Sequence, residues 1–235
     1  MLKPKVLVVV PGFGSPQFGF KKKNLSNNTQ ILRGDSDNFE IKYLIFQYDT
    51  FLISLIENNS DVTVKQEPGV IGEFLNKYVK PEDFRDFSYI LLILDDVELP
   101  KNFSLRVMEQ IYRKYSFDIL SPAIISSSYP YIMQGDTGIR VVNFIEFFCY
   151  FMDWENYRKY HQLIRKYNSR WMWGLDLILY KYFRMGIVDD WKAFHHIHGP
   201  NTMDKERHSE MMNILNEEKE SIFHPFLPQT LCKLS

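Results

Sequence analysis

Hydrophobic residues along the chain fall into short continuous runs separated by stretches of helical spacing. The first run, KVLVVV at residues 5–10, is rich in β-branched residues and ends at Pro11-Gly12, which predicts a buried parallel strand. Residues 88–94 (SYILLIL) form the next strongly apolar run. Further strands are predicted at residues 40–48, 62–66 and 117–125, within residues 139–150, and at residues 186–194.

Helical spacing is clearest at residues 102–115, where Phe103, Val107, Ile111 and Tyr115 share one face. Other helices are predicted at residues 25–34, 70–79, 154–168, 174–184 and 204–220, with loops at residues 11–24 and 126–138. The alternation of strands and helices predicts an α/β fold with a mostly parallel central sheet flanked by helices.

A chain of 235 residues fits one large domain. We expect residues 1–203 to form that domain, and residues 204–235 to be a charged helix and tail packed on it. The apolar positions of this helix can pack on the domain or on a second copy of the chain, which would give a homodimer; they are Met211, Met212, Ile214 and Leu215.

Composition is that of an ordinary globular protein, with 45% hydrophobic and 24% charged residues. The formal net charge of −1 provides no overall positive field to recruit nucleic acid. An anionic ligand must therefore be met by a local device, such as a metal, a helix N-terminus or a few basic side chains. The aromatic content of 16% suits a Phe-rich core or a cleft where rings stack on bases or sugars.

Localisation signals are scarce in the sequence. Cys149 and Cys232 are too far apart to suggest a disulfide framework, which favours a reducing environment. The apolar run after Met1–Lys5 is too short for a signal peptide, and Phe144–Met152 is interrupted by Glu146 and too short to span a bilayer. We expect a soluble, cytoplasmic protein without a transmembrane segment.

An acidic cluster, Asp95, Asp96 and Glu98, follows directly on the predicted strand at residues 88–94. Ligands of open α/β sheets bind outside the carboxyl ends of the strands. Carboxylates this close together repel one another unless a cation or hydrogen-bond donors offset their charge. Mg²⁺ or Mn²⁺ bridging to phosphate suits such oxygen ligands. The alternative is a solvated turn in which Asp caps the helix at residues 102–115.

This strand and cluster resemble the Asp-x-Asp motif of GT-A-type glycosyltransferases. In that superfamily the first carboxylate contacts the nucleoside and the last binds the metal. Asp96-x-Glu98 matches the motif with Glu in the last place, whereas Asp95-x-Val97 does not. The resemblance implies a GT-A-like fold in which Asp95 and Asp96 contact the nucleotide and Asp96 and Glu98 hold the metal.

Two strand ends extend the resemblance. The opening strand is similar to the first strand of GT-A enzymes, which places Pro11 near the nucleotide. Tyr48-Asp49 resembles a Tyr-Asp pair in a plant and bacterial family of proposed glycosyltransferases. There the aromatic ring would stack on the base and the acid would bind a ribose hydroxyl. The alternative is an ordinary strand end followed by an Asp turn.

Trp173-Gly174-Leu175-Asp176 resembles a stretch that opens a helix below the acceptor site in the same family. The resemblance implies that Asp176 is the general base, because an acceptor hydroxyl must lose its proton as the new bond forms. Gly174 would let the backbone approach the sugar, and Trp173 would form an apolar wall. Asp153 would border the acceptor. The alternative makes Asp176 a helix-start residue favoured by the dipole.

Three histidines follow the predicted strand at residues 186–194: His195, His196 and His198. In many GT-A enzymes a late histidine completes the metal site. The family spacing favours His195, with His198 as the rival, and neutral imidazole can ligate Mn²⁺. The alternative is that these are ordinary core or surface histidines.

Together these features predict a metal-dependent glycosyltransferase. It would use Mn²⁺ or Mg²⁺ and move a sugar from a nucleoside diphosphate sugar to a hydroxyl of a glycan acceptor. Lys21–Lys23 could close over the phosphates or form a solvated basic loop. Two other functions fit an acidic cluster: a metal-dependent phosphohydrolase or nucleotidyltransferase, and a catalytically degenerate GT-A domain that binds glycans.

Overall fold

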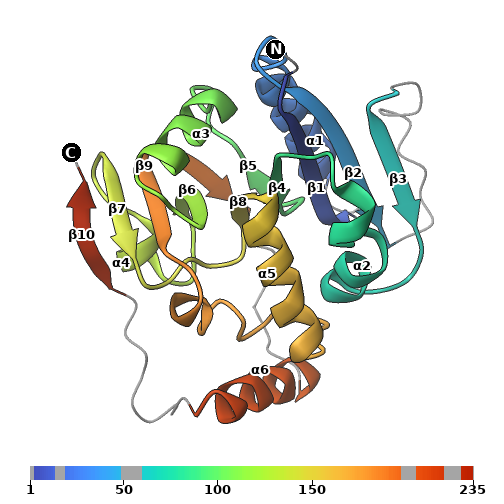
Figure 1. The fold of residues 1–235 in the computed structure, drawn as a ribbon, viewed down its shortest axis with the longest axis vertical. Coiled ribbons are helices and arrows are strands. Elements are labelled where there is room, and N and C mark those ends of the chain that lie inside the picture. The colour runs from blue at the N-terminus through green and yellow to red at the C-terminus, as the bar shows by residue number, and fades with distance from the viewer. Residues whose placement is uncertain (1–2, 14–18, 49–59, 197–204, 220–228, 235) are drawn as a thin grey trace.

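The structure is a computed structural model that describes residues 3–13, 19–48, 60–196, 205–219 and 229–234. Ten strands lie in one sheet with helices on both of its faces (Figure 1). The strands are β1 (Lys5–Phe13), β2 (Glu40–Gln47), β3 (Val62–Gln66), β4 (Tyr89–Ile93), β5 (Val97–Glu98), β6 (Ile119–Ile125), β7 (Ile139–Val142), β8 (Cys149–Asp153), β9 (Met185–His195) and β10 (Thr230–Leu234). They follow the order β10-β7-β9-β6-β8-β4-β1-β2-β3, and β5 pairs with β9 off this path.

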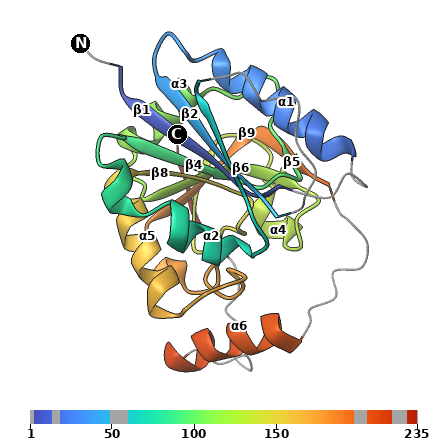
Figure 2. The ribbon, with the colours of Figure 1, turned by 90° about the vertical axis from the view of Figure 1, so that its right-hand side faces the viewer.

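The helices form a layer on each face of the sheet. Figure 2 shows α1 on one face and α2 and α5 on the other. The α-helices are α1 (Gly19–Arg33), α2 (Ile71–Tyr78), α3 (Leu105–Lys114), α4 (Pro130–Met133), α5 (Trp154–Lys166) and α6 (Lys205–Glu217), and the 3₁₀ helices are η1 (Pro81–Phe84) and η2 (Leu179–Lys181). None of these helices is long and apolar enough to cross a membrane.

The central strands are apolar because both of their faces are covered. Val6–Val10 of β1 are at most 4% exposed, and all of β4 is buried. Parallel strands between two helical layers have this composition. The two most apolar runs of the sequence are therefore the middle of the sheet, as predicted.

The sheet is mixed and not purely parallel. β1 is parallel to β2 and β4, and β6 is parallel to β9. β8, however, is antiparallel to both β4 and β6, and β7 is antiparallel to β9. Consequently β1, β2, β3, β4, β6 and β9 all run in one direction, and their carboxyl ends lie at one edge. We call it the carboxyl edge.

The first strand and helix differ from the prediction of a loop at residues 11–24. β1 continues through Pro11 to Phe13, with a register shift after Val10 and Gly12 at φ +86°. Proline has no N–H for a strand ladder, and a positive φ favours glycine, so the irregularity falls where these two residues stand. Helix α1 then begins at Gly19.

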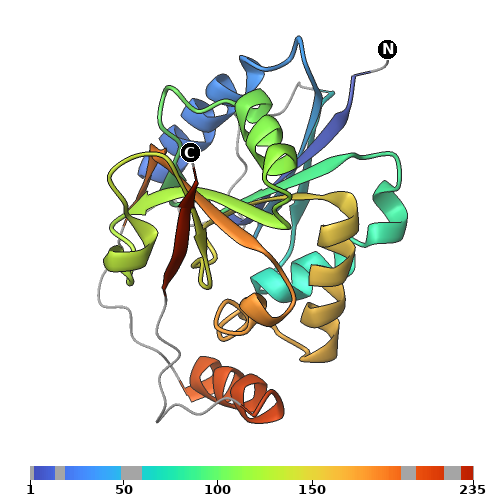
Figure 3. The same cartoon turned by 60° about the vertical axis from the view of Figure 1, so that its left-hand side comes forward.

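Two C-terminal predictions are also corrected. Residues 174–184 do not form an α-helix: Met172 (φ 66°) and Gly174 (φ 90°) break the backbone, and only the short η2 follows. The described end of the tail is a strand, since β10 pairs with β7 at the sheet edge (Figure 3). Its residues are mostly exposed, so its sequence lacks the apolar alternation that would predict a strand.

Helix α6 packs on the rest of the chain, with Ile214 and Leu215 buried. Polar contacts hold it at two points. Glu210 accepts hydrogen bonds from the backbone N–H groups of Arg170 and Trp171 and from Ser169 Oγ. Beyond the helix end, Glu218 accepts hydrogen bonds from residues that precede β9: Lys166, Tyr167, Lys181 and Tyr182.

Candidate active site

The carboxyl edge collects most of the residues that the sequence singles out. Asp95 follows β4, Tyr48 follows β2, and His195 ends β9. Because these strands are parallel, their ends meet at one edge although they are far apart in the sequence. The edge is therefore the candidate active site.

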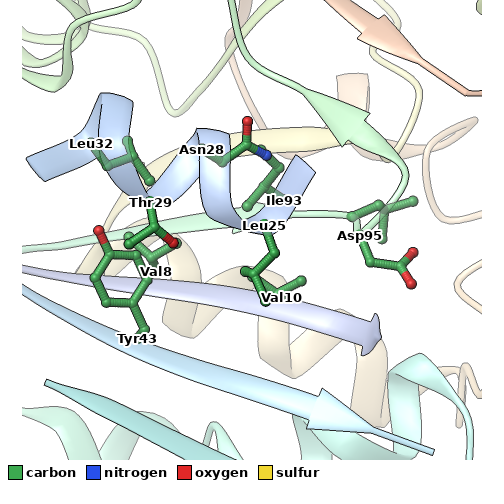
Figure 4. Close-up of a pocket in the computed structure, with 10 residues that line it drawn as sticks. Val8, Val10, Leu25, Asn28, Thr29, Leu32, Tyr43, Ile93 and Asp95 are labelled. Carbon is green, nitrogen blue, oxygen red and sulfur yellow. The ribbon is translucent and has the colours of Figure 1, made fainter. Parts of the chain in front are cut away.

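Asp95 forms a buried ion pair with the first turn of α1. The distance from Lys21 Nζ to Asp95 Oδ2 is 2.7 Å, and the two side chains are 8% and 7% exposed. Figure 4 shows Asp95 beyond the end of β4, on the side of the sheet that α1 covers. Burial lowers the pKa of Lys21, but the charge and hydrogen bond of Asp95 outweigh it, so the net pKa is raised.

Tyr48 and Pro11 lie at the same edge. The Tyr48 ring is 39% exposed, and a side chain at Gly12 would touch it. Its charge when ionised would also be felt by Lys21. Pro11 is buried within β1, so it shapes the backbone and presents little surface. Asp49, predicted to bind ribose, lies outside the described residues.

β5 and the end of β9 form a short antiparallel ribbon that pairs acids with histidines. His195 Nε2 lies 3.5 Å from Asp96 Oδ2, and His196 Nε2 lies 3.4 Å from Glu98 Oε2. Consecutive strand residues point to opposite faces. The neighbours agree with this geometry: His196 stacks on Phe20, whereas His195 packs on Phe148.

Asp96 and Glu98 therefore contact different histidines. The side chains of Asp96, Glu98 and His195, which were predicted to share one metal ion, do not point to a common position. No three His, Cys, Asp or Glu side chains within the described ranges are grouped as a metal site. His198 lies outside those ranges. Glu98 also accepts a hydrogen bond from Asn27 Nδ2 (3.1 Å), which ties it to α1. Among the predicted ligands that the structure describes, Asp96 and His195 form a pair that an ion could share.

His195 contacts a backbone carbonyl group in addition to Asp96. Its Nδ1 lies 3.2 Å from the carbonyl oxygen of Ser126, the residue after β6. Burial lowers the pKa of His195. The hydrogen bond and charge of Asp96, together with smaller contributions from Ser126 and Glu146, raise this pKa by more than burial lowers it. The net pKa is above the usual value, so the pair favours a charged imidazole.

Asp176 lies close to Glu146. Desolvation raises the pKa of Asp176 to about 7, and the negative charge of Glu146 adds to the shift, while the backbone N–H groups of Gly174, Asp176 and Leu177 oppose it. The side chain keeps a partly exposed surface. Tyr129, after β6, is within electrostatic range of both acids. A carboxyl group with a pKa near neutrality suits a general base.

Trp173 and Gly174 are packed against α6. The Arg207 guanidinium carbon lies 5.6 Å from the centre of the Trp173 ring and 4.5 Å from that of Trp171. A side chain at Gly174 would come within 2.9 Å of Met211 Cα. The close approach that Gly174 permits is therefore to a helix of the same chain.

Asp153 lies away from the other predicted residues. It pairs with Tyr89 at the start of β4, the opposite end from Asp95. Its carboxylate caps α5 by accepting a hydrogen bond from Asn156 N (2.7 Å), which satisfies an otherwise unpaired helix donor. The structure does not bring Asp153 to the carboxyl edge.

Asp189, before the histidines, has a structural role. It is fully buried and accepts two hydrogen bonds from Arg140, at 2.5 Å from Nε and 2.8 Å from Nη2. It also accepts a hydrogen bond from Gly135 N (2.8 Å). This bidentate pair joins β9 to β7 and to the loop before β7.

Sequence analysis missed Glu146 and the inward orientation of Lys21. Glu146 is a single acid within the apolar run Phe144–Met152, and a charge interrupting such a run is a usable signal of a site. It accepts hydrogen bonds from Ser127 Oγ (2.6 Å) and Ser128 N (3.1 Å), which hold it beside the end of β6. Lys21 was placed in a loop, where its helical face could not be seen.

Comparison with known proteins finds similarity in structure only, since the sequence matches no protein-family model and no curated protein. GalNAc-T7, crystallised with UDP, GalNAc and Mn²⁺, has a TM-score of 0.58 at 6% identity; the match covers 92% of this chain and 48% of that one. Residues 1–349 of TarS from S. aureus give a TM-score of 0.55 at 12% identity, covering 96% and 74%.

The chain thus spans about half the length of GalNAc-T7. At these identities the similarity establishes the fold and nothing more specific. The predicted fold class is confirmed in that form: the chain has a GT-A-like α/β fold, built on one mixed sheet.

Proposed function

We propose that the protein is a glycosyltransferase that moves a sugar from a nucleoside diphosphate sugar to a hydroxyl of a glycan or glycoconjugate. The observation that carries the proposal is the gathering of Asp95, Asp96 and His195 at the carboxyl edge of a GT-A-like sheet. Glu146 lies within electrostatic range of both His195 and Asp176, and so links Asp176 to this group.

In this proposal the donor lies along the ends of β1, β2 and β4. The exposed ring of Tyr48 offers a face on which a base can stack. Lys21, paired with Asp95, is within electrostatic range of Tyr48, and the ribose and diphosphate would follow in that direction. Asp49 keeps its predicted role at the ribose.

In this proposal the protein ligands of the metal ion are Asp96 and His195. Two protein ligands hold Mn²⁺ or Mg²⁺ best when phosphate oxygens complete the shell, so the ion would arrive with the donor. Such an ion would neutralise charge on the leaving diphosphate. Glu98 instead contacts His196 on the other face, which leaves it out of this site.

Asp176 is the proposed general base. Its deprotonated carboxylate would take the acceptor proton while the hydroxyl oxygen attacks the anomeric carbon and the diphosphate leaves. Glu146 supports this role by raising the pKa of Asp176. Trp173, although packed on α6, keeps a partly exposed surface that an acceptor sugar could contact.

The test is an assay of nucleoside diphosphate release from UDP- and GDP-sugars, with and without glycan acceptors. We expect release that depends on an acceptor and is lost in Asp176→Asn. Asp136→Asn, an exposed acid in the loop before β7, is the matched control and should keep full activity. Acceptor-independent release would instead favour a hydrolase, and nucleotide binding without release would favour a degenerate glycan-binding domain.

A further inference from the structure

The inner face of α1 is polar where a helix covering a sheet is expected to be apolar. Leu25 and Leu32 meet that expectation, but Lys21, Asn24 and Asn28 are buried on the same face. Asn28 has a clear structural task. Its Nδ2 donates to Val97 O (2.7 Å), and its Oδ1 accepts from Leu99 N (2.8 Å), so it fastens α1 to β5.

The Lys21–Asp95 ion pair joins α1 to the end of β4, but stability alone is a weak reason to bury two charges there. Taking both charges out of water costs free energy that their attraction barely repays, and an apolar pair would pack as well. The pair moreover stands at the carboxyl edge, where Lys21 is within electrostatic range of the exposed residue Tyr48. A buried ion pair at a ligand edge is better explained by a ligand than by stability.

Asn24 is a second, independent feature of this face that points to a ligand. It is 1% exposed, and neither atom of its amide has a hydrogen-bond partner among the described residues. Buried polar groups are almost always paired, so an unpaired one calls for an explanation. Positions 21, 24 and 28 are spaced by three and four residues, which puts Asn24 between Lys21 and Asn28 on one face.

The direction of α1 adds to the positive character of this place. The helix begins at the carboxyl edge, its N-terminal N–H groups carry a partial positive charge, and its first turn has no acidic residue. Lys21 lies in this first turn. Anionic groups, above all phosphates, are the ligands that such a combination favours.

We propose that Lys21 and Asn24 bind the diphosphate of the donor. Asp95 holds the Lys21 ammonium in place at the edge, and the phosphate oxygens share that ammonium and accept a hydrogen bond from the Asn24 amide. The inference rests on the proposed function and deepens it: part of the charge on the diphosphate is met by a residue of the chain, whether or not a divalent ion is present.

The test is calorimetric titration with UDP and GDP, and with uridine and guanosine, in EDTA and in Mn²⁺. For the nucleotide that binds, Lys21→Met should weaken affinity by about ten- to a hundredfold, the worth of a lost charge-assisted hydrogen bond. Lys21→Arg should keep most of the affinity. Arg33→Met is the matched control, because Arg33 is an exposed cation in the last turn of the same helix, and it should bind as the unaltered chain does.

The nucleoside without phosphates separates binding from folding. If Lys21 meets the diphosphate, Lys21→Met leaves nucleoside affinity unchanged, whereas a structural defect weakens nucleoside and nucleotide alike. Lys21→Met combined with Asp95→Asn removes both buried charges and provides a second variant if the single one fails to fold.

Equal diphosphate affinity in Lys21→Met and Arg33→Met would overturn the role of Lys21 and leave the proposed function standing. Parallel loss of nucleoside and diphosphate binding in a folded variant would overturn it as well. If the unaltered chain binds neither UDP nor GDP under any condition, the proposed function itself fails, and the role of Lys21 fails with it.

Discussion

At the scale of single residues, Asp176 has the clearest electrostatic consequences. Its pKa is raised to about 7 by desolvation and by Glu146. A base with such a pKa is partly protonated at neutral pH and gains activity as the pH rises. As the pH rises through about 7, we therefore expect the catalytic activity to increase and the contribution of Asp176 to the free energy of unfolding to decrease.

The first prediction concerns the pH profile of transfer. We expect kcat/KM to rise with pH through about 7 and then to level off, because only the deprotonated Asp176 accepts a proton. Asp176→Asn should lower kcat by about 10²- to 10⁴-fold, the usual contribution of a general base. A flat profile between pH 5 and 9, measured with the unaltered enzyme, would remove Asp176 from this role.

The second prediction concerns stability. The pKa of Asp176 is higher in the folded state, about 7, than its ordinary value of 3.8, so the native state binds the proton more tightly between these values. The contribution of Asp176 to the free energy of unfolding is therefore most favourable below the lower pKa and falls as the pH rises towards the upper one.

Asp176→Asn should consequently raise the free energy of unfolding at pH 8 by about 1–2 kcal/mol, a value discounted for partial exposure. The gain should shrink at pH 4. Urea denaturation of both proteins at the two pH values measures it, with Asp136→Asn as the control. Equal stabilisation at pH 4 and pH 8 would contradict the assignment.

The third prediction separates Glu146 from Asp176. Glu146→Gln removes a negative charge near Asp176 while keeping a hydrogen-bond acceptor for Ser127. The pKa of Asp176 should fall, so the rising limb of the pH profile moves to lower pH with only a small loss of maximal activity. A limb that stays in place would show that Glu146 does not act on the base.

Residue patterns singled out Asp95, Asp96 and His195, which follow predicted strands, and Asp176, which stands in a short motif; their roles stay predictions. They could not identify Glu146, whose importance comes from the turn that brings it to the end of β6. They also could not show that Glu98 contacts His196 on the face opposite Asp96, because this depends on which face of the sheet each residue of the short strand β5 points to.

At the scale of elements, helix α6 is held by hydrogen bonds to two acidic residues and by one buried apolar stripe. Its N-terminal half presents Glu210 to the segment Ser169–Trp171, and its apolar stripe buries Ile214 and Leu215. Glu218 closes the other end, and the hydrogen bonds it accepts lower its pKa to about 2 although desolvation opposes them. The helix thereby covers Trp171 and Trp173.

The fourth prediction tests this docking. Glu210→Ala leaves two backbone N–H groups and the Ser169 hydroxyl without their acceptor, which costs about 1–3 kcal/mol. We expect trypsin to cleave faster after Lys205 and Arg207, as followed by mass spectrometry. Glu217→Ala removes an exposed acid from the same helix and should cleave like the unaltered chain.

Elements with a strong apolar period were predicted well, as β4, α3 and α5 illustrate. Helix α1 was placed too late because its inner face carries Lys21 and Asn24, so its apolar period is weak. Strand β10 was missed because an exposed edge strand needs no apolar face. The element predicted at residues 174–184 failed at Met172 and Gly174, whose positive φ angles turn the backbone.

At the scale of the whole molecule, periodicity gave the layers but not the strand directions. A buried run has the same composition whether its neighbour is parallel or antiparallel, so the reversal of β8 between β4 and β6 was invisible. That reversal places Glu146 and Phe148 at the carboxyl edge and sends Asp153 to the opposite one. The mixed sheet is therefore part of how the site is assembled.

The C-terminal tail is part of the central sheet, because β10 pairs with β7. The apolar stripe of α6 is partly used within the chain, and a homodimer through this helix stays a prediction. So do the division at residue 203 and the cytoplasmic location.

The central claim is that the carboxyl edge of β1, β2 and β4 binds a nucleoside diphosphate. Its most direct test is a crystal structure of the chain with UDP or GDP, whichever binds. The account predicts the base against Tyr48 and the diphosphate beside Lys21 and Asp95. A nucleotide bound at any other place, with the Lys21–Asp95 pair undisturbed and remote from it, would contradict the account.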